Sequence, residues 1–103
     1  MRQLQKFDLL INPTTAVTAF PAGQPTTKIG DFAVDEYEGY NPFNFNVNMI
    51  GCPAASIPCG LTATGMPVGL QIIGNFGEES KVLAASAAFE AARPWTQLRP
   101  IIS

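Results

Sequence analysis

Apolar and polar positions along the chain divide its first half into segments of different character. Residues 7–13, FDLLINP, form a short apolar run that ends at a proline, which predicts a buried strand. Residues 13–42 are rich in Pro, Gly and Thr and lack a clear period, so we expect an irregular excursion with at most one helical turn. A loop of this length is uncommon in a compact domain and is typical of a functional or packing segment.

The next segment, NPFNFNVNMIG, predicts a short helix over residues 41–51. Asn41 suits a helix cap, Pro42 suits the first helical turn and Gly51 suits the end. Its apolar residues recur with helical spacing at Phe43, Val47 and Ile50.

Residues 54–74 predict a β-hairpin with its turn at Thr64 and Gly65, because glycine supplies the positive φ that such turns need. In the register that follows, Leu61 faces Val68, Cys59 faces Leu70 and Ile57 faces Ile72, all on one face. The other face carries Gly60, Gly69 and Gln71. Residues this small imply close approach by another backbone or by a helix.

A second helix is predicted over residues 78–93 and stops at Pro94. Acidic residues at its start and Arg93 at its end both suit the helix dipole. The inward stripe is predicted to consist of Val82, Ala85, Phe89 and Ala92.

Composition adds that some of the surface is normally covered. The 103 residues suffice for one domain at most. Hydrophobic residues make up 47% and charged residues 14%, whereas a typical soluble domain is about a quarter charged. Either a second protein or a further part of the same chain is expected to provide the cover.

Charge and apolar run lengths argue against several partners. The net charge is −2 and the six Lys and Arg residues are scattered, so no nucleic-acid partner is expected. No apolar run reaches the roughly 18 residues of a membrane span, so no membrane partner is expected. The N-terminus lacks the apolar core and cleavage site of a signal peptide. With two cysteines and no such signal, the expected location is the reducing cytoplasm.

Ser56 is the first candidate for chemistry. A serine nucleophile needs a base within hydrogen-bond reach and donors for the oxyanion. The chain has no His, and Ser56 lies in AASIP rather than in a G-x-S-x-G elbow. We therefore interpret Ser56 as a structural strand residue.

Other reactive side chains also favour structural roles. Cys52 and Cys59, without a His or a further Cys, do not form a zinc pattern, and two free thiols are expected more than a disulfide. The acidic residues within 35–38 fit a solvated face better than an acid–base pair. The aromatic residues of YEGYNPFNF favour core or an apolar pocket wall over a nucleic-acid platform. We expect no complete catalytic set, no metal site and no cofactor.

Three segments taken together carry a resemblance to a known family: FDLLINPTTAVTAFP, FNVNMIGCPAASIPCGLTATGMPVGLQIIG and EESKVLAASAAFEAARPW. Over about residues 6–95 the chain resembles the C-terminal part of amidase-signature enzymes. That family includes bacterial amidases, fatty-acid amide hydrolases and the amidase component of glutamyl-tRNA amidotransferase. The resemblance implies an α/β fold, namely the C-terminal part of an α/β/α unit with a large mixed sheet. Residues 1–103 would then be a single partial domain.

The family hydrolyses carboxylic acid amides through a serine nucleophile, a second serine in a cis peptide and a lysine. These residues belong to the N-terminal half and to a Gly/Ser-rich signature, and neither is present in the 103 residues. Ser56 corresponds to a family strand, so the resemblance implies no catalytic role for it.

The resemblance also implies that this part of the fold supplies sheet strands and a wall of the substrate pocket. Thr14 and Thr15 follow the first strand at a loop near the pocket. Residues 40–48, which include Asn41 and Phe45, align with another wall. The amidotransferase members of the family have an acidic residue that grips the substrate amine at the position of Asn41. The neutral Asn41 favours a general amidase with an apolar substrate.

Two hypotheses follow for the chain. The main one is a C-terminal fragment of an amidase, inactive alone, that acts on a small-molecule amide together with the missing N-terminal part of the fold. The alternative is an independent, non-catalytic binding or assembly module derived from such a tail. The first predicts oligomers through exposed sheet edges, and the second predicts a compact monomer.

Overall fold

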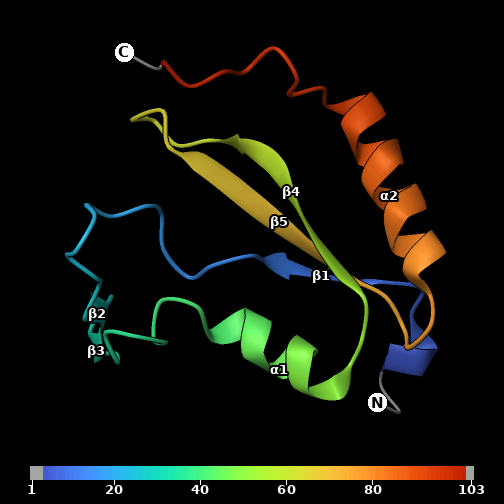
Figure 1. Ribbon diagram of the computed structural model, residues 1–103, viewed down its shortest axis with the longest axis horizontal. Coiled ribbons are helices and arrows are strands. Elements are labelled where there is room, and N and C mark those ends of the chain that lie inside the picture. The colour runs from blue at the N-terminus through green and yellow to red at the C-terminus, as the bar shows by residue number, and fades with distance from the viewer. Residues whose placement is uncertain (1–3, 102–103) are drawn as a thin grey trace.

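The computed structural model describes residues 4–101. It contains a small 3₁₀ helix, two α-helices and five strands (Figure 1). In chain order the elements are η1 (Leu4–Lys6), β1 (Leu10–Pro13), β2 (Lys28–Ile29), β3 (Phe32–Ala33), α1 (Pro42–Ile50), β4 (Ala54–Leu61), β5 (Pro67–Ile73) and α2 (Glu79–Ala92). No helix within the described range is long and apolar enough to cross a membrane.

The centre of the molecule is a three-stranded sheet in the order β1-β5-β4, with both pairings antiparallel. The prediction of a strand near residues 7–13 is confirmed for Leu10–Pro13. The prediction that this strand is buried is wrong, because Leu10 is 45% and Ile11 is 61% exposed. β1 lies at the edge of the sheet, whereas α2 makes its main contacts with β4 and β5.

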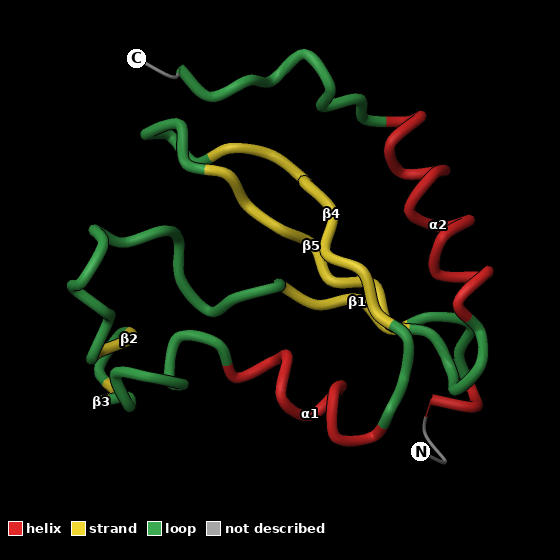
Figure 2. Tube along the Cα trace, in the orientation of Figure 1, coloured by secondary structure: helices red, strands yellow, loops and turns green. Residues whose placement is uncertain are grey.

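Helix α2 covers one face of the hairpin, as Figure 2 shows. The predicted helix forms over Glu79–Ala92, and Arg93 occupies the cap position before Pro94. Val82 is buried with Ile57 and Ile72 in the core. Half-buried residues of the helix and its flanks pack around that core: Ala85, Phe89 and Trp95. Ala92, predicted to belong to the inward stripe, is exposed.

Helix α1 lies on the opposite face of the sheet. Gln71 and Ile72 are consecutive in β5, so their side chains point to opposite faces. Ile72 packs with α2, while Gln71 donates a hydrogen bond from Nε2 to Oδ1 of Asn44 in α1, at 2.8 Å. Two helices therefore enclose the sheet, and the predicted α/β/α layering is confirmed for this part of the fold.

The ends of α1 follow the predicted signals in part. Pro42 occupies the first turn, and Gly51 ends the helix in the left-handed region with φ of +69°. Asn41 stands at the cap position, but its side chain caps no backbone N–H. Instead, Asn41 Oδ1 accepts a hydrogen bond from Asn44 Nδ2 at 2.6 Å.

The β4–β5 hairpin is confirmed, but its predicted register is wrong. The loop holds three residues, 63–65, because the Gly65 N–H donates to the Thr62 carbonyl and the Thr62 N–H donates to the Met66 carbonyl. A further irregularity lies between Pro58 and Gly60. Each feature shifts the pairing by one residue, so the partners become Leu61 with Pro67, Ile57 with Leu70 and Ala55 with Ile72. Two one-residue shifts together preserve the faces, which is why Ile57 and Ile72 still share the core.

The excursion over residues 13–42 is mainly irregular, as predicted, but it contains a small antiparallel pair, β2 and β3, that was not predicted. Asp35 shapes the acidic stretch that follows. Its Oδ1 accepts hydrogen bonds from the N–H groups of Tyr37 and Glu38, at 2.9 and 3.0 Å. The carboxylate therefore organises a turn at the surface, in agreement with a solvated role.

Candidate functional site

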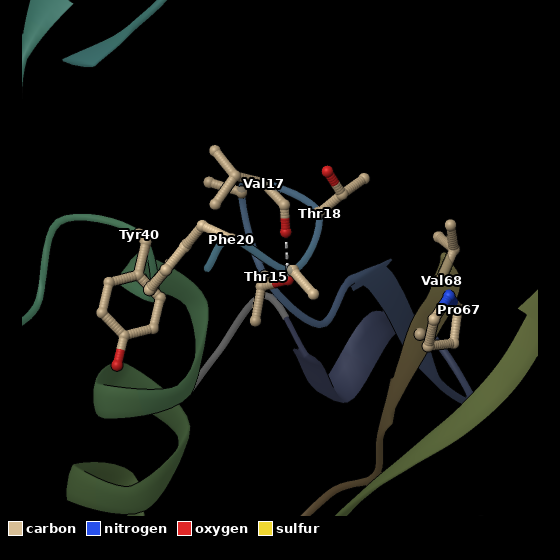
Figure 3. A pocket seen from close by; sticks show the side chains of 10 residues that line it. Thr15, Val17, Thr18, Phe20, Tyr40, Pro67 and Val68 are labelled. Carbon is tan, nitrogen blue, oxygen red and sulfur yellow. Dashed lines mark hydrogen bonds between the residues drawn. The ribbon is translucent and has the colours of Figure 1, made fainter. Parts of the chain in front are cut away.

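A groove of about 560 Å³ lies between the loop after β1 and the start of β5 (Figure 3). Its lining residues are Thr15, Ala16, Val17, Thr18, Ala19, Phe20, Tyr40, Pro67, Val68 and Gly69. They come from three segments that are far apart in the sequence. Backbone hydrogen bonds hold these segments together, since Thr14 N donates to the Gly69 carbonyl and Ala16 N donates to the Tyr40 carbonyl, each at 3.0 Å.

Aromatic and aliphatic side chains form most of the groove surface. The rings of Phe20 and Tyr40 meet edge to face, with centroids 5.1 Å apart and planes at 82°. Figure 3 shows this pair on one side of the loop and Pro67 and Val68 on the other. Aromatic pairs of this geometry hold each other in place, so the wall is ordered in the absence of a ligand.

The polar groups of the groove are hydroxyls, and one of them is already used locally. Thr15 Oγ1 donates to the Val17 carbonyl at 2.8 Å and thereby fixes the turn of the loop. Thr18 and Tyr40 supply the other hydroxyls. All lining residues that the structure describes are uncharged. The groove can hold an uncharged, largely apolar group, but it offers neither an ion-pair partner nor a general base.

Thr14 lies beside the groove and contacts Ser56. Their hydroxyl oxygens are 2.7 Å apart, which joins the loop after β1 to β4 across β5. Gly69 lies beneath this pair, and a Cβ atom at Gly69 would lie 2.7 Å from Thr14 Oγ1 and 2.8 Å from Ser56 Oγ. The predicted close approach at the small face of the hairpin is therefore made by two hydroxyl side chains. Ser56 forms a structural bond, and the described residues provide no base beside it.

Side-chain amides form a second polar feature beneath α1. Gln71, which is 5% exposed, donates to Asn44, and Asn44 donates to Asn41. This chain of hydrogen bonds ties the start of α1 to the central strand. It also places Asn41 at the end of an amide network. The Asn41 carboxamide oxygen is therefore already occupied by a donor.

The four residues predicted to form the pocket wall are distributed unequally. Thr15 lines the groove, Thr14 lies directly beside it, and Asn41 follows the groove residue Tyr40. Phe45 lies on α1, is 44% exposed and is not part of the groove lining. The structure thus brings Thr14 and Thr15 to one place, and the role of all four as substrate contacts stays a prediction.

Sequence reasoning did not single out Phe20, Pro67 and Val68, which form much of the wall. Their participation depends on contacts between segments about fifty residues apart. The aromatic stretch around Tyr40 was the one local signal for an apolar pocket wall.

A larger groove, of about 970 Å³, lies between the hairpin and the segment after α2. Leu61, Trp95 and Leu98 are among its lining residues, together with the half-buried Cys59. None of the predicted pocket residues lines it. Size alone does not mark a site, so the smaller groove beside Thr14 and Thr15 is the candidate.

Comparison with known proteins places these features in a family. The Amidase family model matches residues 1–83. Among curated relatives, the glutamyl-tRNA(Gln) amidotransferase of Synechococcus sp. (strain JA-3-3Ab) has a matching component, its A-type subunit. That relative is 40% identical over 100 residues, which span 97% of this chain and 18% of the relative.

Solved structures show the same relation. A bacterial aryl acylamidase of the amidase-signature enzymes is 37% identical, with a TM-score of 0.80 over 94% of this chain and 22% of that enzyme. The 6-aminohexanoate cyclic dimer hydrolase is 31% identical, with a TM-score of 0.83 over 97% of this chain and 22% of that enzyme. The chain therefore spans about a fifth of the length of these relatives, and it matches their C-terminal portion. By the family model and by the fold, this chain belongs to the amidase-signature family.

Proposed function

We propose that the 103 residues supply sheet strands and one wall of the substrate pocket to an amidase-signature hydrolase, and that they are inactive alone. The observation that carries this proposal is the family match over residues 1–83 combined with a groove that contains no general base. The serine nucleophile and its lysine would come from the N-terminal part of the fold. A cytoplasmic location remains part of the proposal, and the free thiols of Cys52 and Cys59 suit it.

The substrate class follows from the groove. Its lining is uncharged and mostly apolar, so it suits the acyl or amine part of a neutral carboxylic acid amide. A zwitterionic amino acid amide would have no ion-pair partner there. The neutral Asn41, whose side-chain oxygen already accepts a bond from Asn44, supports the same choice. We propose a general amide substrate with an aromatic or aliphatic group.

The test compares the chain alone with the chain plus a partner. The partner is the N-terminal part of the bacterial aryl acylamidase, without the portion that matches this chain. The substrates are 4-nitroacetanilide and simple aliphatic amides and esters. We expect no turnover by the chain alone and hydrolysis by the mixture. Serine-type turnover by the pure chain would contradict inactivity alone, and an inactive mixture would contradict the role as a pocket wall.

A groove variant separates a pocket wall from a merely structural segment. Val17→Asp introduces a charge into the groove, and we expect it to raise the KM for 4-nitroacetanilide by about tenfold or more, because the charge must be desolvated. Leu83→Asp, on an exposed position of α2, is the matched control and leaves the KM unchanged. An unchanged KM in Val17→Asp would remove the groove from the proposal.

The alternative function is an independent, non-catalytic module. It requires a chain that buries its own apolar surface. The exposed apolar side chains of β1, Leu10 and Ile11, favour the fragment instead.

A further inference from the structure

The central sheet has two outer edges within the described residues, one along β1 and one along β4. Backbone hydrogen bonds show which groups face outward. Thr14 N donates to the Gly69 carbonyl, and Gly74 N donates to the Pro53 carbonyl. Because bonding direction alternates along antiparallel strands, the N–H and C=O groups of Ile11 in β1 and of Ser56 in β4 point away from β5. Both edges therefore present backbone groups to a further strand.

The β4 edge carries features that natural proteins use to stop pairing. Pro58 occupies an outward-facing position by the same alternation, so it offers no N–H there. The irregularity between Pro58 and Gly60 interrupts the ladder beside it. The outward part of β4 also has small side chains at Ala54 and Ser56. Proline, a bulge and small side chains are typical of a strand that ends a sheet.

The β1 edge has the opposite character. Leu10 and Ile11 are consecutive, so they lie on opposite faces of the sheet, and they are 45% and 61% exposed. Pro13 limits outward donors only at the end of the strand. Large apolar side chains exposed on both faces require a neighbouring strand and a layer on each side of it.

The whole chain exposes more surface than a self-contained domain. Its accessible surface is 7657 Å², whereas a compact protein of 11.0 kDa exposes about 5,600 Å². The radius of gyration is 15.4 Å, against about 13 Å for a compact chain of this length. The relatives are about five times longer, so the missing cover has the size of the rest of an amidase-signature domain.

We propose that the outer edge of β1 pairs with a strand of the amidase-signature domain outside these 103 residues, and that β4 is a true edge of the completed sheet. The inference rests on the proposed function and adds to it the side on which the sheet continues. The incoming strand carries apolar residues on both faces, because it must meet Leu10 on one face and Ile11 on the other. It can belong to the same polypeptide or to a separate one, since the edge requires only the strand.

Hydrogen exchange at two matched amides tests the edge directly. The chain is kept dilute, where sedimentation shows a monomer, and is mixed with the N-terminal part of the aryl acylamidase. The amides of Ile11 and Ser56 both point outward, so both exchange quickly in the free chain. On mixing, we expect the Ile11 amide to slow by about tenfold or more and the Ser56 amide to stay within about twofold.

Two lysine variants provide an independent readout. Ile11→Lys places a charge at the β1 edge, and Ala54→Lys places the same charge at the β4 edge. Both positions are exposed in the free chain, so both variants are expected to fold, as circular dichroism would verify. We expect Ile11→Lys to weaken binding of the N-terminal part by about tenfold or more and Ala54→Lys by less than about threefold, since only the first charge is buried by pairing.

The outcomes separate this inference from the proposed function. An active complex in which Ser56 is protected and Ile11 is not would overturn the edge assignment while keeping the amidase role. Equal protection of Ile11 with and without the N-terminal part would assign the edge to a second copy and also overturn it. A mixture that forms no complex and hydrolyses no amide would overturn both.

Discussion

At the residue scale, Val82 is the best indicator of how α2 is held on the sheet. It is 3% exposed and packs with Ile57 and Ile72, whereas its neighbour Leu83 is 67% exposed. Val82→Ala removes two buried methyl groups and is expected to lower the free energy of unfolding by about 2 kcal/mol. A urea titration followed by circular dichroism measures the change. Leu83→Ala is the control, expected within about 0.5 kcal/mol of the parent, and equal effects would show that the helix face is wrong.

Phe89 shows how tertiary structure changes a residue-scale expectation. Its helical spacing predicts a core residue, and a fully buried Phe changed to Ala costs about 3–5 kcal/mol. In the structure Phe89 packs against the core but is only half-buried. The expected cost of Phe89→Ala falls accordingly, because part of the ring already contacts solvent in the folded chain.

The start of α2 carries a titratable pair. Lys81 Nζ lies 2.9 Å from Glu78 Oε1, and Asn75 Nδ2 donates to Glu78 Oε2 at 3.2 Å. The hydrogen bond from Lys81, followed by that from Asn75, lowers the pKa of the Glu78 carboxyl below its ordinary value. A lowered pKa stabilises the fold above the unfolded-state pKa of Glu78, and the contribution is lost as pH falls through the lowered value.

Lys81→Met should therefore raise the pKa of Glu78 toward its ordinary value and flatten the acid side of the stability profile. The pair is partly exposed, so the effect on stability is small. A carbon-detected NMR titration of the Glu78 carboxyl measures the pKa. Lys28→Met, in β2, is the control, and an unchanged Glu78 pKa in Lys81→Met would show that Lys81 is not the cause.

At the element scale, the hairpin loop depends on Gly65. Gly65 has φ of +84°, and a Cβ placed on it would have no other atom within 4 Å. The cost of a side chain here comes from the backbone alone. Gly65→Ala should lower the free energy of unfolding by about 1–2 kcal/mol. Gly65→Asn should cost less, because Asn tolerates the left-handed region. The midpoint of urea unfolding compares the two, and equal costs would contradict this account of the turn.

The same hairpin shows how far sequence patterns reach. Alternation placed Ile57, Leu70 and Ile72 on one face, and the structure agrees. The partner of each residue was wrong, because a three-residue loop and a bulge each shift the register by one. Face depends on local alternation, whereas register depends on the turn geometry and on irregularities that no local pattern signals.

At the scale of the whole molecule, exposed apolar surface governs behaviour. Fully buried apolar residues among those described are few: Val47, Ile57, Ile72, Ile73 and Val82. The isolated chain is therefore expected to bind the dye ANS under native conditions and to self-associate as its concentration rises. Fluorescence and sedimentation measure both, and adding the N-terminal part of the aryl acylamidase should suppress both. A compact monomer that binds no dye would favour the independent module.

The sequence by itself determined the local elements and the family. Helix caps, prolines and apolar spacing act over a few residues, so α1, α2 and the β4–β5 hairpin were readable, and the Gly- and Pro-rich motif pointed to amidase-signature enzymes. Only the tertiary structure decided the register, the exposure of β1 and the groove. Each depends on contacts between distant segments, such as Thr14 with Ser56 or Ala16 with Tyr40. Those contacts arise from packing three layers together, and no short stretch of sequence encodes them.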